Sequence, residues 1–307
     1  MIRIVLAAVI AVPLGLDLYI PAPEDNPLTQ ARIEIGRRLF HDRRLSRDQS
    51  LACASCHDPK RAFSTAKPLS VGVFGRQGRR NVPALINRGY GKLFFWDGRV
   101  TSLEEQVLKP IQDPYEMDMT VAEASTRVGL SVDDISRSLA SYVRSILSGD
   151  TPFDRFVHGD HRALSAEQRT GLMIFRTKGN CIACHVGANF TDERLHNTGI
   201  AWRPSGGPGP AGRYLDDGQF AVSGAEEHRG RFKTPTLREV DHTSPYMHDG
   251  SKATLEDVVN FYDDGGRPNS NLDIEIRPLG LTVEEKRALV SFLRSLSGRV
   301  REGQLVH

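Results

Sequence analysis

All four cysteines of the chain fall in two copies of one short pattern, CASCH (53–57) and CIACH (181–185). The pattern C-x-x-C-H is the attachment signature of a c-type haem, whose iron is ligated by the adjacent histidine. Zinc sites and redox dithiols also use C-x-x-C. Zinc does not require the histidine, however, and a redox motif belongs to a βαβ pattern that we do not find here. Two complete copies predict two covalently attached haem c groups, bound by Cys53, Cys56, His57, Cys181, Cys184 and His185.

The elements that position these motifs are helical and repeated. Each motif follows an amphipathic helical pattern, LTQARIEIGRRLF (28–40) or LSAEQRTGLMIF (164–175), and both patterns contain G-x-x-x-F. Thr29 and Ser165 are suitable N-caps for these helices. Strand signals are few and short, and the run RPSGGPGPAG (203–212) predicts a loop. Further helices are predicted over 131–147, 254–262 and 282–296.

The repeat predicts a mainly α fold of two tandem cytochrome-c-like helical domains, each with one covalently bound c-type haem. The chain of 307 residues is long enough for two domains. We expect a signal peptide or N-terminal anchor over residues 1–22. The first cytochrome c domain is expected over 23–157, and the second is expected over 158–307.

The bulk composition describes a soluble globular protein. Apolar residues make up 39% and charged residues 25%, and the net charge of +2 gives no reason to expect nucleic acid as a partner. The apolar run from Ile4 to about Leu16 is shorter than the roughly 20 residues of a spanning helix and fits a secretory signal. No clean Ala-x-Ala site follows it, so an uncleaved anchor is the alternative. Because c-type haem is attached outside the cytoplasm, we expect a periplasmic protein.

The ligand on the far side of each iron separates electron transfer from catalysis. No histidine occurs in the sequence between His57 and His158. The segment FFWDGRVTSLEEQVLKPIQDPYEM (94–117) instead places Gln106 and Glu116 among prolines. These two side chains are candidates for a hydrogen-bond donor and a proton shuttle in an open pocket.

The sequence resembles the bacterial di-haem cytochrome c peroxidases and the related MauG proteins, and it fits the MauG-like subgroup. The resemblance covers nearly the whole chain after the N-terminal segment. Besides the two C-x-x-C-H motifs, it rests on WDGR (96–99), LEEQ (103–106), PIQDPYEM (110–117), KTPTLR (233–238), SPYMHDGS (244–251) and LEDVVNFY (255–262).

The resemblance implies roles for individual residues. The first domain is expected to hold the peroxide-reactive (peroxidatic) haem, with His57 as its proximal ligand, and the second domain is expected to hold the electron-transfer haem. Glu116 is the expected acid/base on the far side of the peroxidatic haem. Gln106 and Pro110 shape the same pocket, and Trp96 matches the tryptophan between the two haems. A calcium ion between the haems is expected on oxygen ligands from Asn81, Thr243 and Pro245.

Two departures favour the MauG-like subgroup. The first is Val73, which stands where ordinary peroxidases of the family carry a far-side histidine. We therefore expect a five-coordinate first haem that is open without prior reduction. The second is Tyr262, which replaces the methionine ligand of the second haem; Met247 is the rival ligand. A phenolate stabilises the higher oxidation states of iron, whereas a thioether favours the ferrous state.

We therefore predict a di-haem peroxidase that reacts with hydrogen peroxide and stores oxidising equivalents across both haems. We expect its electrons to come from a protein donor or protein substrate, which is a c-type cytochrome, a cupredoxin or a MauG-like target. We expect the protein to be a monomer or homodimer. The alternatives are a cytochrome c peroxidase that reduces peroxide to water and a non-catalytic electron carrier.

One further departure keeps us from predicting the quinone-cofactor chemistry of MauG. MauG carries a tryptophan before its second motif, where this chain has Lys178 and Gly179. The other tryptophan, Trp202, is expected at the surface.

Overall fold

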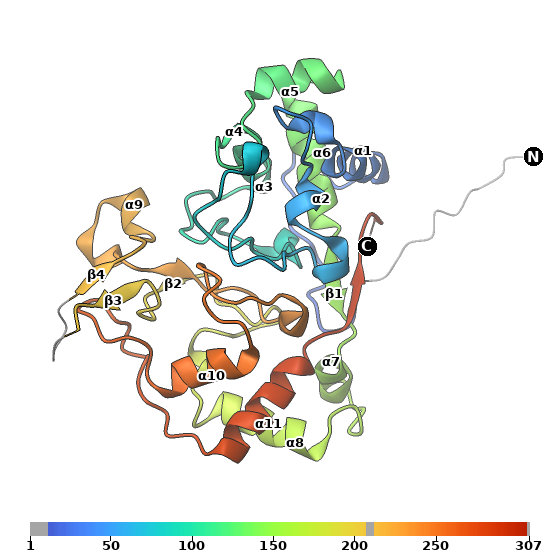
Figure 1. Ribbon diagram of the computed structural model, residues 1–307. Coiled ribbons are helices and arrows are strands. Elements are labelled where there is room, and N and C mark those ends of the chain that lie inside the picture. Colours follow the sequence, from blue (N-terminus) through green and yellow to red (C-terminus); the bar gives the residue numbers. More distant parts are fainter. Residues whose placement is uncertain (1–11, 207–211, 306–307) are drawn as a thin grey trace, which may run out of the picture.

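The computed structural model describes residues 12–206 and 212–305, and it places two helical lobes one above the other (Figure 1). The upper lobe in this view contains the helices of the first half of the chain, and the lower lobe contains those of the second half. The described helices are α1 (Gln30–Phe40), α2 (Cys53–Cys56), α3 (Leu103–Gln106), α4 (Lys109–Gln112), α5 (Val121–Val128), α6 (Val132–Arg144), α7 (Pro152–Val157), α8 (Ala166–Arg176), α9 (Phe220–Ser223), α10 (Leu255–Asp263) and α11 (Val283–Arg294).

The long helices confirm the predictions from hydrophobic periodicity. Helices α1, α8, α10 and α11 each lie within two residues of the predicted ranges. Helix α6 ends at Arg144, three residues before the predicted end at 147, because Leu147 begins strand β1. The N-caps Thr29 and Ser165 are also confirmed. The Thr29 side chain accepts a hydrogen bond from the backbone N–H of Arg32, and Ser165 forms a capping box with Gln168. In the described part of the chain, seven short 3-10 turns lie between the helices, at Arg43–Leu45, Pro59–Arg61, Val73–Gly75, Arg88–Tyr90, Cys181–Ala183, Glu226–His228 and Val240–His242.

The glycine of the repeated G-x-x-x-F pattern has the same function in both lobes. Helix α1 crosses α6 so closely that a Cβ on Gly36 would lie 1.9 Å from the carbonyl oxygen of Ser138. Helix α8 crosses α11 in the same way, and a Cβ on Gly171 would lie 1.9 Å from the carbonyl oxygen of Ala288. Only glycine permits such an approach. The two helix pairs are therefore structural counterparts, as the internal repeat suggested.

Each lobe has its own hydrophobic core. The chain passes from the first lobe to the second before α7, and it returns to the first lobe at its C-terminal strand. The first core gathers buried residues from Ile33 to Ile146, and the second gathers residues from Leu164 to Leu296. Phe153 and Phe156 of α7 pack on the second core. The C-terminal strand β6 (Arg299–Arg301) returns to the first lobe and pairs antiparallel with β1 (Leu147–Gly149). The boundary at residues 157/158 stays a prediction.

The remaining strands are short, as predicted. Strand β2 (Leu195–His196) pairs with β5 (Phe232–Lys233), and β3 (Trp202–Pro204) pairs with β4 (Gly212–Tyr214). The prediction of a loop over 203–212 is therefore wrong at both ends, where the residues form a hairpin; residues 207–211 lie outside the described part. The surface position expected for Trp202 is also wrong. Its ring is buried and stacks edge-on against Tyr214 at 4.8 Å between ring centroids.

Residues 12–22 pack on the folded body. Leu16 and Ile20 are buried against Leu147, and the carbonyl oxygen of Gly15 accepts a hydrogen bond from Arg238 at 2.8 Å. Cleavage after residue 22 would remove these contacts and expose Leu147. The first eleven residues of the predicted signal peptide or anchor lie outside the described part. Within residues 12–206 and 212–305, no helix is both long and apolar enough to span a membrane.

Candidate haem-binding sites

The second C-x-x-C-H motif opens on an apolar cavity of about 280 Å³ between the two lobes. Most of the wall comes from the lower lobe, and the segment around Trp96 closes it from the upper lobe. The cavity brings together many of the residues singled out from the sequence, namely Asn81, Trp96, Cys181, Cys184, His185, Thr243, Pro245, Met247 and Tyr262.

The His185 ring is oriented to ligate a metal through Nε2. Its Nδ1 lies 2.8 Å from the carbonyl oxygen of Phe190. A carbonyl oxygen only accepts hydrogen bonds, so Nδ1 carries the proton and donates it, which leaves Nε2 with its lone pair free. Burial lowers the pKa of His185 to about 4, so the imidazole is neutral at neutral pH. This is the tautomer that haem iron requires.

Tyr262 faces the same cavity from the last turn of α10. The residue is half-exposed because part of its surface faces the cavity. Burial raises the pKa of the phenol, and the nearby thiols of Cys184 and Cys181 raise it further. A phenolate at this position therefore requires a positive partner such as ferric iron. Met247 also lines the cavity, so the geometry leaves both candidate ligands on its wall.

The first C-x-x-C-H motif repeats this arrangement. Helix α2 carries both thiols on a single turn, and the backbone N–H of His57 donates to the carbonyl of Cys53 at 2.9 Å. Nδ1 of His57 lies 3.1 Å from the carbonyl oxygen of Phe63, which again leaves Nε2 free. Burial lowers the pKa of His57 to about 4. Burial also raises the pKa of Cys53 to about 12 and that of Cys56 to about 11.

Glu116 lies close to the first motif and has an unusual acidity. Its pKa is raised to about 7. Burial is the largest cause, the charge of Asp113 also raises the pKa, and the charge of Arg99 lowers it. The Glu116 charge in turn raises the pKa of both Cys53 and Cys56, which places the carboxyl within electrostatic range of the thiols. A carboxyl with a pKa near neutrality is suited to acid/base catalysis.

The loop at Val73 is bound directly to the Glu116 segment. Val73 is fully buried, and its backbone N–H donates to the carbonyl oxygen of Glu116 at 2.8 Å. Pro110 in α4 contacts the same segment, because its carbonyl accepts a hydrogen bond from the N–H of Met117 at 3.2 Å. Gln106 ends α3 and is half-buried. Across the described residues, no hydrogen bond joins the Gln106 side chain to Glu116.

Trp96 connects the two lobes. Its indole Nε1–H donates to the carbonyl of Asn81 at 2.8 Å, and its own carbonyl accepts from the N–H of Lys233 at 2.7 Å. The ring packs on a small cluster that includes Ile200 and Phe232 of the second half. The Asn81 side chain donates from Nδ2 to the carbonyl of Pro68 at 3.0 Å. Its Oδ1 accepts no hydrogen bond from the described residues and is free to ligate a cation.

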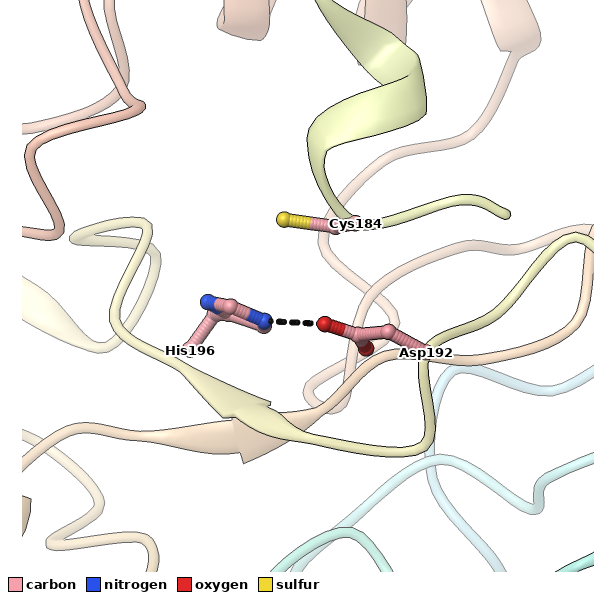
Figure 2. A group of neighbouring side chains, drawn as sticks. All are labelled: Cys184, Asp192 and His196. Carbon is pink, nitrogen blue, oxygen red and sulfur yellow. Dashed lines mark hydrogen bonds and ion pairs between the residues drawn. The ribbon is translucent and has the colours of Figure 1, made fainter.

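Figure 2 shows a group that resembles a metal site, formed by Cys184, Asp192 and His196, whose potential ligand atoms lie within 4.8 Å of one another. The sulfur of Cys184 belongs to the second haem-attachment motif. Both ring nitrogens of His196 are already bound by carboxylates, Nε2 by Asp192 at 2.8 Å and Nδ1 by Asp273 at 2.5 Å. The hydrogen bond to Asp273, together with Cys184 and Asp192, raises the pKa of His196 to about 11. Cys184 and His196 line the cavity, and the two carboxylates hold His196 in place there through hydrogen bonds.

Several polar residues of the cavity were not predicted from the sequence. They are Arg88, His196, Lys233, Arg238 and His248, all of which line it. Lys233 and Arg238 lie in KTPTLR and His248 in SPYMHDGS, so the motifs marked the segments but not the function of these side chains.

The residues present fit a covalently attached haem at each motif. Each site offers two thiols without a disulfide partner beside a neutral histidine with a free Nε2, and the second adds an apolar cavity. Two such sites in one helix-rich chain are the features of a di-haem c-type protein, and the carboxyl with raised pKa beside one of them indicates an enzyme.

Comparison with known proteins agrees. The family model for di-haem cytochrome c peroxidase matches residues 30–162. Cytochrome-c peroxidase IdrP2 of Denitromonas iodatirespirans is 36% identical in an alignment that covers 90% of this chain and 84% of that protein. The methylamine utilization protein MauG of Methylorubrum extorquens is 35% identical over 295 residues, which cover 90% and 81%.

A solved structure of a MauG-like protein associated with microbial copper homeostasis has a TM-score of 0.82 and 29% identity, and it covers 97% of this chain and 96% of that one. The chain belongs to the family of di-haem cytochrome c peroxidases and MauG proteins, and it is an oxidoreductase of that family.

Proposed function

We propose that this protein reacts with hydrogen peroxide at a haem held by Cys53, Cys56 and His57, and shares the oxidising equivalents with a haem held by Cys181, Cys184 and His185. In this proposal each haem belongs to one of two tandem cytochrome-c-like domains of an exported, periplasmic protein. The oxidised protein then accepts electrons from an external protein, as a MauG-like enzyme.

The environment of Glu116 supports its function as acid and base. A haem held by Cys53, Cys56 and His57 would supply the iron for cleavage of the O–O bond of peroxide. Glu116, with a pKa of about 7, takes the proton from one peroxide oxygen and returns it to the other, which leaves as water. Pro110 contacts the Glu116 segment through the N–H of Met117, and Gln106 supplies an amide donor on the neighbouring helix.

The observation that carries the proposal is the buried Val73 beside Glu116. The side chain at this position is apolar, and its backbone is hydrogen-bonded to the Glu116 carbonyl. A valine cannot ligate iron. We therefore propose that the His57 site stays open to peroxide without prior reduction. This distinguishes the protein from peroxidases that first displace a histidine.

Tyr262 is the proposed second ligand at the His185 site. Its phenol lies on the cavity wall within electrostatic range of both thiols of the motif. As a phenolate it favours oxidised iron, which makes this site a store of oxidising equivalents rather than an acceptor of electrons from a cytochrome. Trp96, whose N–H is held by Asn81, relays charge between the sites. A calcium ion on Asn81, Thr243 and Pro245 fixes this junction; all three residues line the cavity.

The test is the reaction of the fully oxidised protein with hydrogen peroxide, followed by absorption spectroscopy without any reductant. The proposal expects both haem spectra to change within one reaction. A protein that reacts only after one-electron reduction would overturn it and would favour the cytochrome c peroxidase alternative. Sequence identity does not separate the two functions, because this chain is 36% identical to a cytochrome-c peroxidase and 35% identical to a MauG protein. Turnover with a reduced cytochrome or cupredoxin then identifies the class of donor.

A further inference from the structure

Three polar side chains interrupt the apolar lining of the second cavity, the cations Arg88 and Lys233 and the imidazole of His248, and Trp96 lines the same cavity. The peptide N–H of Lys233 is bonded to the Trp96 carbonyl at 2.7 Å, and the rings of His248 and Trp96 are 6.5 Å apart. The three residues are all buried, at most 9% exposed.

The carboxylate nearest to Arg88 and Lys233 is that of Glu193, and both of its oxygens already accept hydrogen bonds. Glu193 binds Arg88 through both oxygens, at 2.8 and 3.2 Å, and accepts from the backbone N–H groups of Lys92 and Leu93 at 3.1 and 3.3 Å. Although burial alone would raise its pKa, the charge of Arg88, its hydrogen bonds and the charge of Lys233 hold the pKa of Glu193 at about 2. Glu193 does not line the cavity. Arg88 and Lys233 therefore share one carboxylate, and Arg88 is the closer of the two cations.

Among the described residues, Lys233 has only a counter-ion that it shares with Arg88. Its Nζ donates to the carbonyl of Thr234 at 2.9 Å and reaches Glu193 only at 3.4 Å. The other carboxylate that acts on it, Asp192, is bound by His196. Burial, followed by the charge of Arg88, lowers the pKa of Lys233 to about 8. A buried ammonium facing a cavity needs an anion within that cavity.

His248 provides a second, independent indication. Its ring stacks on Phe232 at 3.7 Å between centroids, and its Nε2 is 3.9 Å from the nearest oxygen of Asp216. Its Nδ1 is buried and has no hydrogen-bond partner among the described residues. Buried polar atoms in native proteins are almost always satisfied. The missing partner of His248 therefore belongs to a group that occupies the cavity.

We infer that Lys233 and His248 form a carboxylate-binding part of the second cavity, in which the Lys233 ammonium pairs with a haem propionate and His248 Nδ1 binds the propionate groups by hydrogen bonding. The two residues are positioning residues, because they hold the cofactor beside Trp96 without touching the reacting peroxide. The inference rests on the proposed haem at Cys181, Cys184 and His185.

The test compares matched charge changes on the purified di-haem protein. Lys233→Met removes the buried ammonium, and Lys233→Arg retains a cation. Lys178→Met is the control, because it also removes a lysine charge, but Lys178 forms a partly exposed ion pair with Glu285 at 2.6 Å and does not line the cavity. His248→Phe keeps an aromatic ring on Phe232 without the nitrogen, and His248→Asn keeps a hydrogen-bonding group near the Nδ1 position.

Three readouts separate the outcomes. The haem content per chain, measured first, must be two; a lower value in the unmutated protein contradicts the proposed function itself. With two haems, Lys233→Met should lower the midpoint potential of the second haem and shift its propionate bending band in resonance Raman spectra. Lys233→Arg should restore both, and Lys178→Met should change neither. His248→Phe should shift the same band, and His248→Asn should shift it less.

Two results overturn the inference while leaving the proposed function intact. The first is that Lys233→Met has the same midpoint potential of the second haem and the same propionate band as Lys178→Met. The other is an unshifted propionate band combined with a potential that responds to added formate, since Lys233 would then bind a free anion. If Lys233→Met does not fold, an unshifted propionate band in His248→Phe is the contradicting result.

Discussion

The acidity of Glu116 leads to a quantitative prediction for the reaction with peroxide. Its pKa of about 7, against an ordinary value of 4.5, comes mainly from burial. The ionised carboxylate is the base, so the rate constant should rise as the pH increases through about 7. Between about pH 6 and about pH 8 the ionised fraction increases about tenfold, whereas an ordinary glutamate would already be fully ionised over this range.

Replacement of the Glu116 carboxyl tests the same reasoning, because the reasoning predicts how far the rate constant should fall. Glu116→Gln keeps the shape of the side chain but cannot take a proton, so the second-order rate constant for peroxide should fall by about 10²–10⁴-fold. This corresponds to about 3–5 kcal/mol of transition-state stabilisation. The matched control is Glu105→Gln, which removes a partly exposed carboxylate paired with Lys109. Stopped-flow absorption of the ferric protein measures both variants across the pH range.

The result that refutes this reasoning is specific. A rate constant in the unmutated protein that is constant from about pH 6 to about pH 8 would show that Glu116 has an ordinary acidity. A Glu116→Gln variant that reacts at the rate of Glu105→Gln would show that no proton passes through this carboxyl.

Three further predictions concern ligation and stability. Tyr262→Met should raise the midpoint potential of the second haem and introduce a methionine-to-iron charge-transfer band, whereas Met247→Leu should leave the spectrum unchanged; the opposite pattern would assign Met247 as the ligand. Arg238→Met should lower the free energy of unfolding by roughly 3–5 kcal/mol in denaturant titrations, because it leaves the buried carboxylate of Asp154 unpaired, and a loss below about 1 kcal/mol would contradict this. A chain that starts at residue 23 should lose roughly 3 kcal/mol relative to one that starts at residue 12, because two buried aliphatic side chains are removed, and equal stabilities would show that the segment contributes nothing.

The parts of the structure that depend on local sequence were predictable. The spacing of C-x-x-C-H is set within one turn of chain, and α2 shows that turn directly. The long helices follow from apolar periodicity, and their N-caps follow from Thr29 and Ser165. The repeated glycine signalled a repeated helix pair, and the close contacts of Gly36 and Gly171 give the physical reason.

The parts that depend on distant contacts were not predictable. The Arg88–Glu193 pair joins residues 105 positions apart, and it is this pair that leaves Lys233 without a full counter-ion. The lack of a partner at His248 Nδ1 depends equally on packing between distant segments. Trp202 was misplaced for the same reason, because a glycine- and proline-rich flank predicts exposure while the contact with Tyr214 buries the ring.

The central claim is an open first haem and a second haem without methionine ligation. The most direct measurement is the combined absorption and EPR spectrum of the ferric protein as isolated, before any reductant or peroxide is added. The account predicts one high-spin five-coordinate haem, from the site of His57 and Val73, and one low-spin haem without a methionine-to-iron charge-transfer band, from the site of His185 and Tyr262. Two six-coordinate low-spin haems, one of them with that band, would contradict it.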